Sequence, residues 1–219
     1  MTAIIFDMDG VLIDSQPLHY EIDMRVIKAC GYPAELSTVT PYTGISNPDR
    51  WPKYKDTLKL SPQTEELIKM SEEAMRDIFA NADITAITGI QKLLQNLKAM
   101  EIPTGVASSS SHELIQMVLT RAEIGQYFDV IISGEEVEFG KPNPDIYLKA
   151  ANKIGLSPEK CIAIEDAPAG ILAAKNAGLT CIAYKNPNTY GQVFTHADYV
   201  VEKYDECIPI IDRLKRRNK

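Results

Sequence analysis

Five short segments of the chain are almost continuously apolar, and polar or helix-patterned sequence separates them. Such runs are typical of strands that are covered on both faces, as in a parallel sheet. The predicted strands are residues 3–6, 102–108, 128–133, 161–165 and 180–184.

Apolar residues at helical spacing fill the intervals between these runs. One stripe runs from Ile90 to Met100, and a second runs from Leu114 to Leu119 after a helix start at Ser111. A third segment, 167–178, ends on Gly178, as helices often do. The alternation from residue 87 onward predicts an α/β fold with a doubly wound, mostly parallel, Rossmann-like sheet.

Residues 16–82 interrupt that alternation, because they contain helical patterns and no convincing strand. Leu18, Ile22 and Val26 recur at four-residue spacing, and residues 64–79 form another helical pattern. Residues 40–52, with three prolines and a glycine, read as a loop. We therefore expect an α/β core formed by residues 1–15 and 83–219, with a small helical domain, residues 16–82, inserted after the first strand.

Composition narrows the classes of partner. The chain has 219 residues, of which 45% are hydrophobic and 24% charged, and its net charge of −7 argues against a nucleic-acid or anionic-membrane surface. No apolar stretch approaches the roughly 20 residues that span a bilayer, and acidic residues interrupt the pattern of a signal peptide. Four scattered cysteines fit reduced thiols, so we expect a cytoplasmic protein with no obligate protein partner evident.

The first strand runs into a pair of acidic residues, Asp7 and Asp9, followed by Gly10. If strand geometry persists to Asp9, the two carboxylates share a face, at the sheet edge where α/β proteins bind ligands. Two close carboxylates repel, so either one keeps a proton or a cation joins them. The pair taken alone could also be only the polar end of a strand, with a turn-forming acid beside a solvated one.

Other strand ends also carry polar chemistry. Ser108 and Ser109 begin a run of hydroxyls, which can hold phosphate oxygens together with backbone N–H groups. Lys141 stands between a glycine and a proline, and Pro142 and Pro144 stiffen the backbone there. Glu165 and Asp166 form a second acidic pair, and acids at two strand ends are what a hard cation such as Mg²⁺ needs.

These residues together resemble the haloacid dehalogenase superfamily, specifically the subgroup with a helical cap after the first strand. That subgroup includes β-phosphoglucomutases and small sugar-phosphate phosphatases. Its four motifs have matches in order: D-x-D-G-V at 7–11, Ser108 after an apolar strand, Lys141 in G-K-P-x-P-D, and Glu165-Asp166 in E-D-x-x-x-G. The resemblance extends over essentially the whole chain.

The resemblance implies a role for each motif residue. Asp7 would be the nucleophile that forms an aspartyl-phosphate, and Asp9 would be the general acid and base. Ser108 and Lys141 would bind and neutralise the transferring phosphoryl group. Mg²⁺ would be held by Asp7, the main-chain carbonyl of Asp9 and Asp166, with Glu165 bound directly or through water. The expected activity is Mg²⁺-dependent hydrolysis of a small phosphorylated metabolite, such as a sugar phosphate.

Two other functions stay open. A β-phosphoglucomutase, interconverting β-glucose 1-phosphate and glucose 6-phosphate, would use the same core, and a non-catalytic binding protein could retain the fold. Mutases carry an arginine where this chain has Asn47, and Arg50 follows three residues later, so the sequence favours a phosphatase. The candidate substrate-binding residues are His19, Asn47, Arg50, Lys69 and Ser109.

Overall fold

The computed structural model describes residues 1–217 except 44, 46, 190 and 191. Contacts within the chain divide it into two compact units. The first consists of Met1–Asp14, Ile84–Pro187 and Gln192–Lys219, and the second consists mainly of Ser15–Asp83. Each unit is described by itself below.

The first unit is built on one parallel sheet. In chain order its strands are β1 (Ala3–Phe6), β2 (Thr104–Ser108), β3 (Val130–Ser133), β4 (Cys161–Glu165), β5 (Thr180–Tyr184) and β6 (Tyr199–Val201). In space the order is β3-β2-β1-β4-β5-β6, and every neighbouring pair is parallel. The first five strands match the predicted apolar runs, whereas the short edge strand β6 was not predicted.

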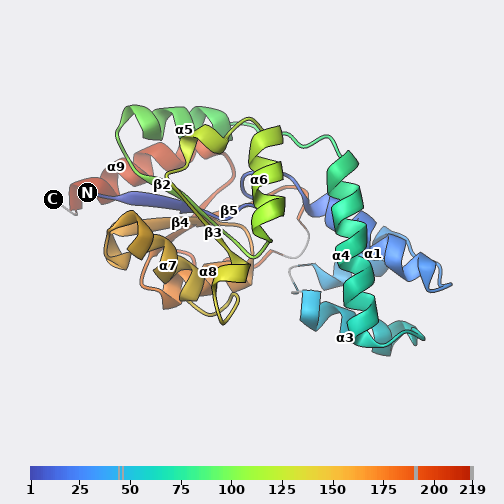
Figure 1. The fold of residues 1–219 in the computed structure, drawn as a ribbon. Helices are drawn as coiled ribbons and strands as arrows, with labels where there is room; N and C mark the ends of the chain where they lie inside the picture. The colour runs from blue at the N-terminus through green and yellow to red at the C-terminus, as the bar shows by residue number, and fades with distance from the viewer. Residues whose placement is uncertain (44, 46, 190–191, 218–219) are drawn as a thin grey trace. The chain divides into compact units, whose positions relative to one another are not determined.

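Helices cover both faces of this sheet. They are α5 (Ile90–Ala99), α6 (His112–Arg121), α7 (Asp145–Ile154), α8 (Pro168–Asn176) and α9 (Cys207–Arg217). Helices α7 and α8 lie on one face, and α5 and α9 lie on the opposite face (Figure 1). The predicted doubly wound α/β fold is confirmed. The coverage also explains why β1, β2 and β4 are buried along their whole length.

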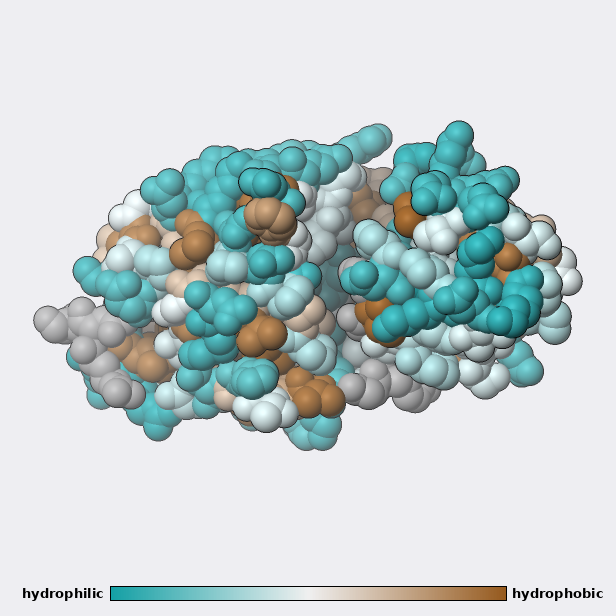
Figure 2. Space-filling view, turned by 90° about the horizontal axis from the view of Figure 1, so that it is seen from below, coloured by the Kyte–Doolittle hydropathy of each residue, from teal (hydrophilic) through white to brown (hydrophobic). Residues whose placement is uncertain are grey.

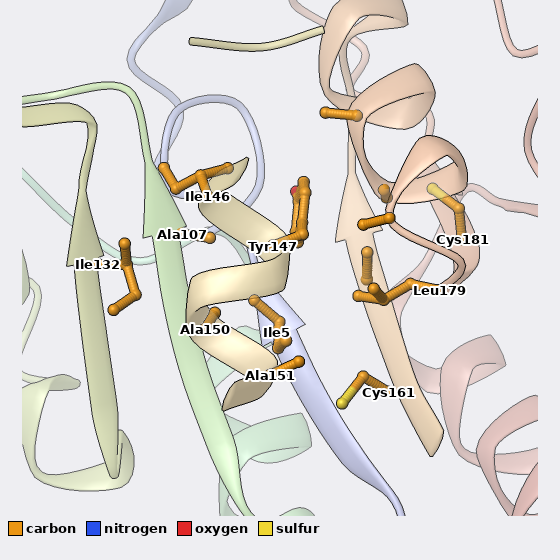
Figure 3. Close-up of a cluster of buried hydrophobic side chains, with 14 of the residues drawn as sticks. Ile5, Ala107, Ile132, Ile146, Tyr147, Ala150, Ala151, Cys161, Leu179 and Cys181 are labelled. Carbon is orange, nitrogen blue, oxygen red and sulfur yellow. The ribbon is translucent and has the colours of Figure 1, made fainter. Parts of the chain in front are cut away.

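One hydrophobic cluster joins the sheet to α7 and α8. Ile5 of β1 and Ala107 of β2 face Ile146 and Ala150 of α7, as Figure 3 shows. Side chains alternate between the two faces along each strand, so Ile4 and Phe6, also fully buried, belong to the opposite face. The central strands are therefore fixed from both sides, which makes the position of their carboxyl ends well defined.

The second unit is helical among its described residues. It contains α1 (Gln16–Ala29), α2 (Leu36–Val39), α3 (Asn47–Leu58) and α4 (Thr64–Asn81). The predicted loop over residues 40–52 was wrong for its second half, because α3 begins at Asn47 and contains Pro52. A proline cannot donate a backbone hydrogen bond, yet the helix continues past Pro52, and its residues Trp51 and Tyr54 are fully buried. Gly44 and Ser46 of the same segment lie outside the described residues.

The surface carries separate apolar side chains. The exposed large hydrophobic residues among those described are Met1, Leu36, Phe139, Leu148, Val193 and Val200. On the face seen in Figure 2, apolar side chains form scattered spots on a mostly hydrophilic surface, which is ordinary for a globular protein. In the part of the chain that the structure describes, no helix is long and apolar enough to cross a membrane.

Candidate active site

The candidate site lies where the strand order of the sheet reverses. The chain winds outward from β1 through β2 to β3, and then returns to the other side of β1 with β4. Asp7 directly follows β1, and its backbone N–H donates to the carbonyl of Ile164 in β4 at 2.9 Å. Ligands of α/β proteins bind in the crevice at such a reversal, beyond the carboxyl ends of the strands.

Lys141 is the centre of a buried ionic cluster. Its Nζ lies 2.6 Å from Oδ1 of Asp7, 2.7 Å from Oε1 of Glu165 and 3.0 Å from the carbonyl oxygen of Ala107. The Lys141 side chain is only 9% exposed. An ammonium has three protons, and each has an acceptor here. Among the residues singled out from the sequence, the structure thus brings Lys141 into direct contact with Asp7 and Glu165.

Glu165 is held on several sides at the end of β4. Its Oε1 also accepts a hydrogen bond from the hydroxyl of Tyr147 at 2.6 Å, and its Oε2 accepts one from the backbone N–H of Asp166 at 3.2 Å. A Cβ atom at Gly170 of α8 would lie 1.9 Å from Oε1 of Glu165. The glycine of the E-D-x-x-x-G motif thus leaves space for this carboxylate.

Three buried carboxylates are close enough to share a cation. Oxygen atoms of Asp7, Glu165 and Asp166 lie within 4.8 Å of one another. A Cβ atom at Gly10, whose φ is +77°, would lie 2.2 Å from Oδ2 of Asp166, so a side chain there would displace that carboxylate. The three residues offer only oxygen ligands, and Gly10 leaves room beside them, which suits a hard divalent cation. The single positive charge of Lys141 does not replace such a cation.

The buried charges shift one another's ionisation. Burial raises the pKa of Asp7 to about 7, against the lowering effect of the Lys141 ammonium. Burial also raises the pKa of Asp166 well above its usual range, and the neighbouring Asp7 and Glu165 carboxylates raise it further. Burial disfavours the Lys141 cation, but the carboxylates of Asp7 and Glu165 hold its pKa above the ordinary value. Three acids thus share one buried cation, a deficit of positive charge that a metal ion would correct.

Asp9 occupies the turn after Asp7. The strand ends at Phe6, so the condition that strand geometry persists to Asp9 is not met. Asp9 instead pairs with Ile13 in an isolated bridge, and its Oδ2 accepts a hydrogen bond from the hydroxyl of Ser110 at 3.2 Å. The side chain is half-buried, and it is not one of the three clustered carboxylates.

The serines at the end of β2 and directly after it differ in their positions. Ser108 is buried, and its hydroxyl accepts from the backbone N–H of Ser110 at 3.1 Å. Ser109, a candidate for substrate binding, is exposed, and its carbonyl oxygen would be 2.7 Å from a Cβ at Gly134. Ser110, rather than Ser109, contacts an acidic residue of the first motif.

His19 and Lys69 belong to the helical unit. His19 lies on α1, where its ring is 5.7 Å from that of Phe79 and tilted against it. Lys69 is exposed on α4.

Asn47 and Arg50 are bound within the helical unit. Arg50 is 12% exposed, and its Nε lies 3.0 Å from Oδ2 of the buried Asp23. Its two terminal nitrogens donate to the carbonyl of Ile45 and to Oδ1 of Asn47. Asn47 in turn donates to the hydroxyl of Ser71 at 2.9 Å. The guanidinium is therefore already occupied by partners of its own unit.

Two residues of the candidate site, Ser110 and Tyr147, were not predicted from sequence. Ser110 belongs to a run of four serines, which gives no signal as to which hydroxyl faces Asp9. Tyr147 lies on the apolar face of α7, where an aromatic residue is ordinarily only a core residue. The one available signal was its position six residues after Lys141.

The fold and the site define a class of enzyme: an α/β protein with a buried aspartate after its first strand, and a lysine and acidic residues from later strand ends beside it. The family model of haloacid dehalogenase-like hydrolases matches residues 4–184. The chain belongs to this family, as the sequence motifs indicated.

Relatives of the chain include both phosphatases and mutases. A phosphorylated carbohydrates phosphatase of Thermotoga maritima is 32% identical over 179 residues, covering 82% of each chain. A β-phosphoglucomutase of Bacillus subtilis is 31% identical over 209 residues, covering 93% of this chain and 90% of the other. The crystal structure of a β-phosphoglucomutase from Clostridium difficile matches with a TM-score of 0.82 and 28% identity, over 99% of this chain and 98% of that one.

Proposed function

We propose that the chain is a Mg²⁺-dependent phosphomonoesterase that hydrolyses a small phosphorylated metabolite through an aspartyl-phosphate on Asp7. The observation that carries this proposal is the buried contact of Lys141 with Asp7, beside the carboxylates of Glu165 and Asp166. A nucleophilic carboxylate, a fixed cation and an acidic cluster are the parts that phosphoryl transfer requires.

Asp7 is the proposed nucleophile. One of its oxygens attacks phosphorus, a bond from Asp7 to phosphorus forms, and the bond from phosphorus to the ester oxygen breaks. Lys141 stabilises the negative charge of the transferring group, and its contact with Asp7 keeps the nucleophile in place. Ser108, buried at the end of β2, is proposed to bind a phosphoryl oxygen.

Asp9 is proposed to move the protons. It donates a proton to the leaving ester oxygen in the first step, and then accepts one from the water that attacks phosphorus in the second. That water takes the phosphoryl group, and Asp7 is released unchanged. The hydrogen bond from Ser110 holds the Asp9 carboxyl group during this exchange.

The metal ion is proposed to be Mg²⁺, held by Asp7 and Asp166, with the main-chain carbonyl of Asp9 and, directly or through water, Glu165. The buried oxygen donors within 4.8 Å of one another support this assignment. When bound, the ion supplies positive charge that keeps Asp7 ionised and neutralises the phosphoryl oxygens.

The pairing of Arg50 within the helical unit favours a phosphatase over a mutase. Arg50, which could take the place of the mutase arginine, is already paired with Asp23 and Asn47. The T. maritima relative is named as a phosphatase of phosphorylated carbohydrates, so a sugar phosphate is the first substrate to test. We further propose that residues 16–82 form a cap that selects the substrate, and that the enzyme acts in the cytoplasm.

The test is release of inorganic phosphate from a panel of sugar phosphates, nucleotides and p-nitrophenyl phosphate. We expect release with Mg²⁺, none with EDTA, and none from Asp7→Asn, since an amide is a poor nucleophile. Asp205→Asn is the matched control, because Asp205 is an exposed carboxylate of the same unit.

Conversion of β-glucose 1-phosphate to glucose 6-phosphate in the presence of the 1,6-bisphosphate would instead assign a mutase. Phosphate release by Asp7→Asn at the wild-type rate would contradict the mechanism, and no release by the wild type would favour a non-catalytic binding protein.

A further inference from the structure

Tyr147 contributes a hydroxyl to the ionic cluster from inside the hydrophobic core. The residue lies on α7 and is fully buried. Figure 3 shows it among apolar neighbours, with the hydroxyl end directed towards the carboxyl ends of the strands. Its oxygen lies 2.6 Å from Oε1 of Glu165, and its ring centroid lies 5.1 Å from Nζ of Lys141. A buried tyrosine with a short bond to an acid does more than fill space.

The hydroxyl determines where the Glu165 carboxylate lies. Oε1 of Glu165 is shared by two donors, the Tyr147 hydroxyl and the Lys141 ammonium. The close approach of Gly170 restricts the carboxylate on the side of α8. Glu165 is thus held between a helix, a tyrosine and a lysine. Unlike the lysine, the tyrosine carries neither charge nor a role in the proposed chemistry.

Lys141 depends on this arrangement because it must change partners during the reaction. Its ammonium donates one hydrogen bond each to Asp7, to Glu165 and to the carbonyl of Ala107. An incoming phosphoryl oxygen can accept a hydrogen bond from the ammonium only if one of these three hydrogen bonds is broken. When Asp7 becomes phosphorylated, the contact with Glu165 is the remaining ionic anchor of the ammonium.

We propose that Tyr147 is a positioning residue for phosphoryl binding: its hydroxyl fixes Glu165, and Glu165 fixes the ammonium of Lys141. The inference rests on the proposed function of the same site. In this proposal Tyr147 acts through Glu165 and Lys141 and does not itself contact the substrate.

The variant Tyr147→Phe tests this inference, because it removes the hydroxyl and keeps the ring. We measure the affinity for inorganic phosphate by calorimetry in the presence of Mg²⁺, the affinity for Mg²⁺ alone, and kcat with p-nitrophenyl phosphate. Phosphate affinity and kcat should each fall about tenfold, the size expected for one lost charge-assisted hydrogen bond. Mg²⁺ affinity should change less than phosphate affinity, which a general loss of stability would not produce.

Tyr204→Phe is the matched control. Tyr204 is also buried in the first unit, and its hydroxyl donates to the carbonyl of Val11 rather than to an acidic residue of the cluster. This variant should keep wild-type phosphate affinity. Glu165→Asp provides a second approach, because it withdraws the carboxylate from both donors. It should weaken phosphate binding, and adding Tyr147→Phe in that background should cause little further loss.

The outcomes separate the inference from the proposed function. A wild type that hydrolyses the panel, together with a Tyr147→Phe variant within twofold of it in phosphate affinity and kcat, overturns the inference alone. Equal losses in Tyr147→Phe and Tyr204→Phe also overturn it, because the effect is then not specific to the cluster. A wild type that neither binds phosphate nor releases it contradicts the proposed function, and the inference with it.

Discussion

Lys141 and Asp7 are 134 positions apart in the chain, yet Nζ of the lysine lies 2.6 Å from Oδ1 of the aspartate. The parallel sheet creates this contact, because the loops after its strands meet at one edge. Both side chains are buried, so water screens their interaction little. The pair is the part of the site on which the proposed chemistry depends most.

Replacing Lys141 by Gln should lower kcat by about 10²- to 10³-fold, the loss typical for one charge-stabilising donor. Lys141→Arg should recover only part of the activity, since a planar guanidinium cannot reproduce contacts to three acceptors around one nitrogen. Steady-state kinetics with p-nitrophenyl phosphate measure both effects. Lys149→Gln is the control, because Lys149 pairs with Glu136 at the surface. An Arg variant with full activity would show that charge alone matters.

Gly170→Ala should disturb the site although Gly170 has no functional group. The added Cβ would lie 1.9 Å from Oε1 of Glu165, so the carboxylate must move away from Lys141 and Tyr147. We expect kcat to fall at least tenfold, with a cost of about 1–3 kcal/mol in the free energy of unfolding, as in other overpacked sites. Kinetics and thermal unfolding measure the two effects. Gly125→Ala is the matched control, because its Cβ would meet Leu119 only at an ordinary 3.6 Å. Equal behaviour of the two variants would contradict the crowding at Glu165.

The sequence was informative about the core of the site because the relevant residues follow strands. Asp7, Ser108 and Glu165 each end or follow a continuously apolar run, and a parallel sheet brings those ends together without further information. The fold class could be predicted for the same reason. The edge strand Tyr199–Val201 could not, because three residues with one exposed member carry no strand pattern.

Contacts that depend on packing could not be predicted. Tyr147 has the helical spacing of a core residue, and its position six residues after Lys141 does not by itself indicate a carboxylate at its hydroxyl. The pairing of Arg50 with Asp23 joins two helices, and the prolines around Arg50 suggested a loop instead. Both cases are polar contacts that are fixed by burial rather than by spacing along the chain.

The metal-free protein should become less stable as the pH rises from about 4 to 7. Burial raises the pKa of Asp7 from 3.8 to about 7, so in this window the folded state binds a proton that the unfolded state has lost. Stability therefore decreases with rising pH, since the unfolded state binds fewer protons. Mg²⁺ competes with that proton, so its stabilising effect should grow over the same window.

Thermal unfolding at several pH values, with EDTA or with Mg²⁺, measures this effect. Asp7→Asn should flatten the dependence in EDTA, because its amide does not titrate; the Asp205→Asn control should keep it. A melting temperature in EDTA that rises steadily from pH 4 to 7 in the wild type would contradict the raised pKa of Asp7.

Arg50 should matter for stability more than for substrate affinity. Its Nε lies 3.0 Å from Oδ2 of Asp23, a carboxylate only 4% exposed whose Oδ1 has no hydrogen-bond partner in the described part of the chain. Arg50→Gln leaves that acid buried without its cation, at a cost of about 3 kcal/mol in the free energy of unfolding. Arg25→Gln, which breaks an exposed ion pair with Asp77, should cost less than about 1 kcal/mol.

Thermal unfolding and KM for the best substrate of the panel distinguish the two roles of Arg50. If it acts inside the helical unit, Arg50→Gln lowers the melting temperature, and Asp23→Asn in the same chain restores part of it, because the unpaired buried charge is then removed. If Arg50 instead grips a phosphate, KM rises and the melting temperature stays at the wild-type value. That second result would favour the mutase alternative. It would mean that the guanidinium of Arg50 binds substrate, which its pairing with Asp23 argues against.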